Sequence, residues 1–263
     1  MAAESLHAWR ALLTSWDGWL LTFALAIAVP VLGYLRSHPL PADQDRAVLT
    51  RTKLLSYGKI VCSQWFLVTT MLLILRRHGL FGSDAGQRLA NPRLTFGVTL
   101  VLLSILAIVS AIVLARLRRA KSKTPPRGMR GLRRFAPASR REMAAFAVVC
   151  LTAGFCEELL YRGWLVNLLH AATGSAWIAV VLGAIVFGVG HASQGAWAML
   201  RTALIGVQLG ALFVWVGSLI PGQVLHAGWD LLMGVAAMRA MSRLSSGGAE
   251  SPVERPADTA TSA

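Results

Sequence analysis

A small set of ionisable residues lies inside apolar stretches in the second half of the chain, where a charge is costly. An acidic or basic side chain at mid-bilayer costs about 3 kcal/mol or more, so such residues usually face a cavity and mark function. The six whose types and spacing could support chemistry are Glu157, Glu158, Arg162, His191, His226 and Asp230.

Two pairs in this set are separated by four residues, a spacing that brings both side chains onto one face of a helix. Glu158 and Arg162 can therefore form an ion pair that neutralises both charges inside the protein. His226 and Asp230 can converge on one point in the same way. Glu157 points about 100° around the helix from Glu158 and has no evident partner within its own segment.

This pattern predicts a hydrolytic site. A carboxylate in a low-dielectric environment binds a proton more readily, which suits a general base working near neutral pH. Histidines can supply donors, acceptors or metal ligands. Each residue also has a structural interpretation. Glu158 and Arg162 are expected to brace the helix turn that carries Glu157 whether or not the protein is an enzyme. A lone buried histidine such as His191 is more often a hydrogen-bonded packing residue. Cys156 is more simply a packing residue than a nucleophile.

The elements that carry these residues are expected to be membrane helices. Apolar residues make up 55% of the 263-residue chain and charged residues 14%, against about 25% charged in soluble domains. A membrane crossing needs ~20 mostly apolar residues in a helix. The chain is therefore predicted to be an all-α, polytopic transmembrane bundle of about seven to eight helices, with segments at 16–35, 57–75, 94–117, 142–165, 175–193, 197–217 and 219–239.

The formal net charge of +14 is unevenly distributed: 11 of the 26 basic residues lie in 116–141, between two apolar segments. The positive-inside rule places such a loop in the cytoplasm, where anionic lipid attracts it. We therefore expect lipid rather than nucleic acid as its partner. Alternation along the chain then puts the N-terminus and the loop 76–93 outside and the C-terminus inside.

Three regions are predicted. Residues 1–141 hold the first membrane helices and the basic loop, 142–240 form the catalytic core, and 241–263 have the Ser-, Pro-, Ala- and Gly-rich composition of a disordered tail. Three cysteines, all in apolar segments, provide no disulfide framework.

The motifs Glu157-Glu158-x-x-x-Arg162, Phe187-x-x-x-His191 and His226-x-x-x-Asp230 together resemble those of the CPBP (CAAX protease and bacteriocin-processing, or Abi) intramembrane proteases. That family includes type II CAAX prenyl endopeptidases and lysostaphin-resistance-like proteins. The local text CEELLYRGWL and VFGVGHA adds to the likeness, which covers roughly residues 142–240.

The resemblance implies a role for each residue of the motifs. Glu157 would activate a water molecule that His191 also holds, and Glu158 with Arg162 would brace the site. His226 and position 230 would stabilise the oxyanion. Family members are commonly labelled metalloproteases, but a metal-free glutamate mechanism is the rival account and the one we favour. A zinc ion, if used, would need Glu157, His191 and His226 from three helices.

One position departs from the family pattern, because the third motif most often ends in Asn and here ends in Asp230. An ionised Asp accepts hydrogen bonds only and would repel an oxyanion. Asp230 is therefore expected to be held protonated, to orient His226, or to ligate a metal.

The expected segments leave a disagreement in depth. Glu157 falls ~22 Å along its helix and His191 ~24 Å along the next, antiparallel helix, which does not match across a ~30 Å core. A segment near Gly163, Gly174 or Gly183 is therefore expected to be broken, tilted or re-entrant, unless the boundaries differ.

The function expected from the sequence is endopeptidase activity on a membrane-associated protein or peptide, in a multi-pass protein of a bacterial cell membrane. One alternative is a non-catalytic membrane partner or immunity-type protein with the same fold. The other is a proton-coupled transporter, because carboxylate–histidine chains also relay protons.

Overall fold

Every apolar segment expected from the sequence is helical in the computed structural model, which describes residues 3–35, 46–119 and 135–246. No β-strand occurs within these ranges. The elements are α1 (Ala3–Leu12), α2 (Trp16–Phe23), the π-helix η1 (Ala24–Ala28), α3 (Val29–Leu35), α4 (Arg46–Arg77), α5 (Pro92–Arg119), α6 (Arg140–Glu157), the π-helix η4 (Glu158–Val166), α7 (Asn167–Thr173), α8 (Ala176–Val189), the 3₁₀ turn η5 (Ala192–Gln194), α9 (Ala196–Val216) and α10 (Ile220–Ser246).

Among the described residues, five helical stretches are long and apolar enough to cross a membrane by length and composition: Trp16–Leu35, Ala47–Arg77, Pro92–Arg119, Arg140–Thr173 and Ala196–Val216. α8 is also apolar but has only 14 residues. α10 has 27 residues but is not one of these five stretches. The protein is thus an all-α, multi-pass membrane bundle, as predicted.

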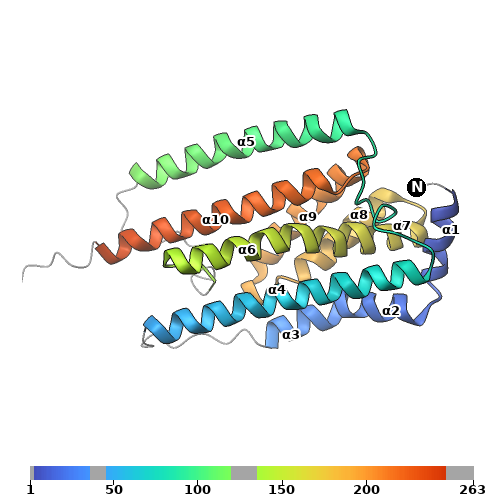
Figure 1. Cartoon of the computed structure of the whole chain (residues 1–263), viewed down its shortest axis with the longest axis horizontal. Helices are drawn as coiled ribbons and strands as arrows, with labels where there is room; N and C mark the ends of the chain where they lie inside the picture. The colour runs from blue at the N-terminus through green and yellow to red at the C-terminus, as the bar shows by residue number, and fades with distance from the viewer. Residues whose placement is uncertain (1–2, 36–45, 120–134, 247–263) are drawn as a thin grey trace, which may run out of the picture.

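The long helices lie side by side along the long axis of the molecule, in the order α5, α10, α6, α4 and α2–α3 (Figure 1). α8 and α9 pack against each other, and α8 also packs against η4. The turn η5 that joins α8 to α9 contacts α3. The second half of the bundle thereby encloses η4, whose nine residues are all buried.

The depth disagreement is resolved by the helix boundaries. The helix that carries Glu157 does not end near residue 165 but continues through η4 and α7 to Thr173. Gly174, with φ 72°, ends it in the left-handed conformation that glycine adopts without strain, and Ser175 caps the start of α8. Glu157 and His191 each lie 17 residues from Gly174, one before it and one after it, so the two residues lie at a similar depth.

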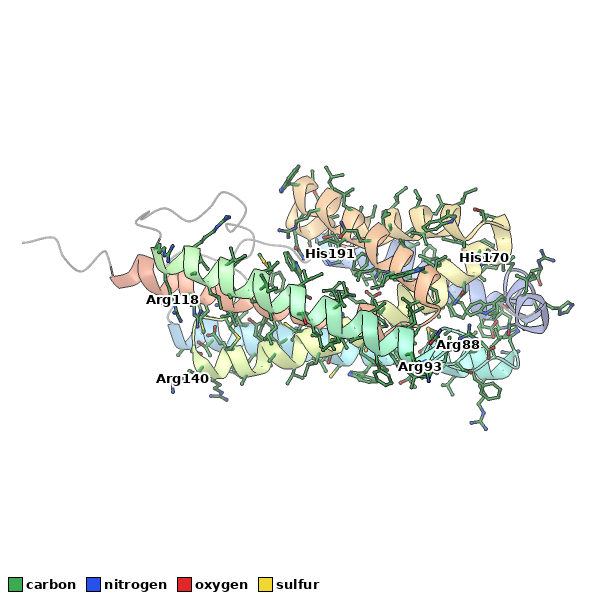
Figure 2. All side chains as sticks on the ribbon, turned by 90° about the horizontal axis from the view of Figure 1, so that it is seen from above. Arg88, Arg93, Arg118, Arg140, His170 and His191 are labelled. Atoms are coloured by element: carbon green, nitrogen blue, oxygen red, sulfur yellow. The ribbon has the colours of Figure 1, made fainter. Side chains whose placement is uncertain are left out.

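Charged residues mark both ends of the bundle. Arg118 and Arg140 lie at one end, Arg88 and Arg93 lie at the other, and His191 lies between (Figure 2). The basic residues at 120–134 and the predicted tail beyond 246 fall outside the described residues; α10 itself continues to Ser246.

Candidate active site

The helix that carries the two glutamates changes its winding at the site. α6 ends at Glu157, and the wider π-helical turns of η4 begin at Glu158. π-helical turns inside α-helices occur frequently at functional sites. The π-helical segment is buried along its whole length: Glu158 is 1% exposed, and the following residues through Val166 are also buried.

Glu158 and Arg162 form the expected ion pair, with Arg162 Nη1 2.9 Å from Glu158 Oε1. Arg162 Nη2 also donates to the carbonyl oxygen of Gly206 in α9, at 3.3 Å. The guanidinium carbon lies 4.4 Å from the centre of the Phe187 ring, which adds a cation–π contact. The pair therefore connects η4 to both α8 and α9.

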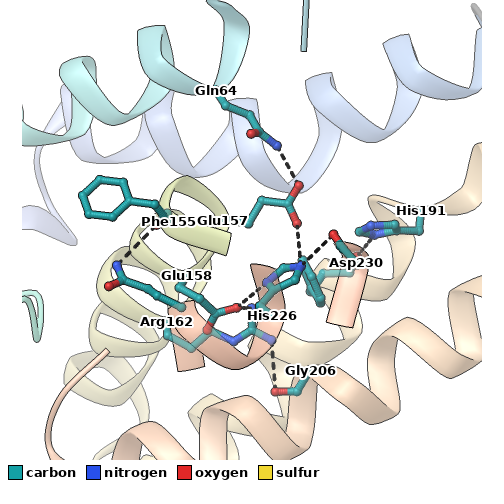
Figure 3. Close-up of polar contacts among 11 residues, drawn as sticks. Gln64, Phe155, Glu157, Glu158, Arg162, His191, Gly206, His226 and Asp230 are labelled. Atoms are coloured by element: carbon teal, nitrogen blue, oxygen red, sulfur yellow. Dashed lines mark hydrogen bonds and ion pairs between the residues drawn. The ribbon is translucent and has the colours of Figure 1, made fainter. Parts of the chain in front are cut away.

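His226 lies at the centre of the cluster (Figure 3). Its Nδ1 is 2.9 Å from the same Glu158 oxygen that binds Arg162. A carboxylate paired with arginine only accepts hydrogen bonds. Nδ1 of His226 is therefore the protonated nitrogen, and it donates this hydrogen bond to Glu158. The other nitrogen, Nε2, lies 3.8 Å from Glu157 Oε2 and 3.6 Å from Asp230 Oδ2.

His191 lies two residues after the end of α8 and is bound by Phe187, the other named residue of its motif. Its Nδ1 is 2.9 Å from the carbonyl oxygen of Phe187, which can only accept, so Nδ1 is the donor. The Phe187 ring packs edge-on against both imidazoles, with centroid distances of 5.0 Å to His191 and 6.0 Å to His226. Phe187, the first residue of the second motif, therefore contacts both histidines.

Sequence reasoning missed Gln64 in α4. Its Nε2 donates to Glu157 Oε1 at 2.7 Å, so Glu157 does have a partner, but from another helix (Figure 3). The available signal was a glutamine within a segment predicted to cross the membrane. Gln223 in α10 was also missed; it is buried and donates to Gln87 Oε1 and to the carbonyl oxygen of Phe155.

The structure thus brings Glu157, Glu158, Arg162, His226 and Asp230 into one cluster of ion pairs and close contacts, with His191 joined to it through Phe187. In the part of the chain that the structure describes, no three His, Cys, Asp or Glu side chains are arranged to hold a metal ion.

The fold and the site together define a class of protein: a multi-pass helical membrane bundle with a buried cluster of carboxylate, arginine and histidine side chains. Residues 139–232, or 94 of the 263, match the family model described as Rce1-like, type II CAAX prenyl endopeptidase. The matched region contains all six candidate residues, and it confirms the resemblance to the CAAX/CPBP protease family for this part of the chain. Neither the curated proteins nor the solved structures gave a match.

Proposed function

We propose that this protein is an intramembrane endopeptidase in which Glu157 activates the attacking water. The observation that carries the proposal is the 3.8 Å separation between Glu157 Oε2 and His226 Nε2. This is too long for a direct hydrogen bond, but one water oxygen can lie at about 2.8 Å from both atoms. The family match over residues 139–232 supports the same reaction class.

In the proposed reaction, Glu157 takes a proton from water as the water oxygen attacks the carbonyl carbon of the substrate peptide. The C–N bond then breaks, and the proton passes from Glu157 to the leaving nitrogen. His226, with Nδ1 held by Glu158, directs Nε2 at the reacting atoms and donates to the oxyanion when that nitrogen is protonated. His191 donates from Nδ1 to the carbonyl oxygen of Phe187, and its Nε2 is the nitrogen that we propose holds the same water.

The proposed substrate is a peptide segment of a membrane-associated protein, because the cluster lies between the two ends of the bundle. The family match makes prenylated, CAAX-terminated peptides the first substrates to test. We also propose that anionic lipid contacts the basic end, where Arg116, Arg118 and Arg119 end α5 and Arg140 begins α6.

The Glu157→Gln variant tests the role of Glu157. Removal of the base should lower peptide cleavage by about 10²- to 10⁴-fold while thermal unfolding stays near that of the wild type, because glutamine keeps the size of the side chain. Cleavage is measured with purified protein in liposomes, using fluorogenic peptides that include prenylated CAAX-terminated ones.

Cys156→Ala is the matched control, because Cys156 is adjacent to Glu157 and fully buried. It should keep cleavage, since the thiol has no part in the proposed reaction. Loss of cleavage in the alanine variant and retention in Glu157→Gln would reverse the two roles. Inhibition by a chelator that added zinc relieves would contradict the metal-free mechanism.

A further inference from the structure

Gln64 approaches the site from a part of the chain that the family match does not cover. It lies on α4, 93 residues before Glu157, yet its Nε2 is 2.7 Å from Glu157 Oε1. The matched region begins at residue 139. The hydrogen bond therefore brings a residue of the first half of the chain into contact with the proposed base.

The position of Gln64 along α4 is fixed independently of this hydrogen bond. The next residue, Trp65, stacks on Phe155 of α6 with ring centroids 5.5 Å apart and planes 25° apart. Phe155 is two residues before Glu157. Because both rings are rigid and bound to adjacent helices, the stack holds the α4 backbone at the depth of the site.

The other end of the Gln64 carboxamide has no competing interaction. Its Oε1 is buried and has no hydrogen-bond partner among the described residues. The orientation of the amide is therefore set by Glu157 alone. With the N–H groups facing Glu157, the amide favours the ionised carboxylate; with the oxygen facing it, only a protonated acid could bind.

We propose that Gln64 is the positioning residue for Glu157: it holds Oε1 of an ionised carboxylate so that Oε2 faces His226. The inference rests on the proposed function, because positioning matters for a base that must be ionised to act. A hydrogen bond to a charged group stabilises that form enough to move a titration midpoint by about one to two pH units.

Other titratable groups lie close to Glu157. Cys156 and Tyr161 lie on its own helix, and His226 and Asp230 face it from α10. Gln64 does not titrate, so its removal leaves this set of groups unchanged. A shift of the Glu157 midpoint on its removal then reports the lost hydrogen bond.

The test replaces Gln64 with Met, which has similar length and no donor, and with Glu. Ionisation of Glu157 is followed in liposomes by infrared titration of the carboxyl band that disappears in Glu157→Gln. Gln64→Met should raise the midpoint by about one to two pH units, and the acid limb of peptide cleavage should move by the same amount. Gln64→Glu should raise it further, since two facing carboxylates do not ionise together.

Gln223→Met is the matched control, because Gln223 lies one turn from His226 but its amide donates to Gln87 and Phe155. The titration midpoint of Glu157 in Gln223→Met should equal that in the wild type. An unchanged midpoint in folded Gln64→Met would overturn the inference while leaving the endopeptidase proposal intact. A shifted band in a protein that cleaves no tested peptide would support the inference and count against the proposed function. If Gln64→Met does not fold, Gln64→Leu, which also lacks a donor and adds no titratable group, decides by the same midpoint.

Discussion

The two adjacent glutamates differ sharply in environment, and the difference supports the separate roles that we propose for them. Glu158 is 1% exposed and one of its oxygens accepts from both Arg162 and His226. Glu157 is 18% exposed in its side chain and has one oxygen free to face His226. Removing one partner of a buried ion pair typically costs about 3–5 kcal/mol, because the other charge is left uncompensated. These environments favour a structural role for Glu158 and the proposed chemical role for Glu157.

The geometry at Asp230 bears on its proposed role. Glu158 already binds Nδ1 of His226, so Asp230 is not needed to orient that ring. Asp230 instead lies 3.6 Å from Nε2, the nitrogen that faces Glu157, and its side chain is 38% exposed. This position favours a donor to the oxyanion over an orienting acceptor.

Asp230→Asn is therefore expected to keep or raise peptide cleavage near neutral pH and to extend it to more alkaline pH. A carboxylic acid donates only while protonated, whereas an amide has no proton to lose in this range. The measurement is the pH dependence of cleavage by purified wild type and variant in liposomes.

Asp230→Ala is the control that removes the donor without replacing it, and it should lower cleavage by about 10²-fold. Lower cleavage by the folded asparagine variant at every pH would instead assign Asp230 to stabilising a charged His226. The histidine would then remain as the side-chain donor to the oxyanion.

At the scale of elements, the site depends on a close approach between α6 and α10. A Cβ atom on Gly154 would lie 2.7 Å from both Ala227 Cβ and the carbonyl oxygen of Gln223, and 2.8 Å from Ala227 N. These contacts come from the turn of α10 that carries His226. Gly154 therefore allows α10 to lie close enough for His226 to reach Glu158.

Gly154→Ala should destabilise the protein by about 1–3 kcal/mol, because two backbone segments must separate, and it should lower cleavage by displacing His226 from Glu157. Thermal unfolding in detergent and cleavage in liposomes measure the two effects. Gly97→Ala on α5 is the matched control: nothing lies within 4 Å of its added Cβ, so stability should be unchanged or slightly higher. Equal effects of the two substitutions would contradict the close-approach account.

Sequence patterns predicted the helices and the four-residue pairs, because periodicity and spacing are local properties. Glu158–Arg162 and His226–Asp230 could be paired by counting residues along one helix. Gln64 could not be placed, since nothing local relates residues 93 positions apart. The continuation of the helix to Thr173 was missed because apolar length alone does not mark where a helix ends. Its stop is provided by Gly174, and the resulting boundary decides the depth of His191.

At the scale of the whole molecule, basic residues occur at both ends of the bundle, but in unequal numbers. Arg88 and Arg93 lie at the end that also holds the N-terminus, while Arg118 and Arg140 lie at the opposite end (Figures 1 and 2). By the positive-inside rule, the heavier basic content of 116–141 predicts that the second end faces the cytoplasm. The loop between α4 and α5 then faces the opposite side of the membrane.

Cysteine labelling tests this orientation. In a background with Cys62, Cys150 and Cys156 replaced by alanine, Ser83→Cys in the α4–α5 loop and Arg140→Cys at the start of α6 place one thiol at each end. A membrane-impermeant maleimide added to intact cells should label the first and not the second, and inside-out vesicles should reverse the result. Both sites are exposed, so access rather than burial controls the reaction. Labelling of both from one side would contradict a bundle whose ends lie on opposite faces of the membrane, and labelling of Arg140→Cys alone in intact cells would invert its orientation.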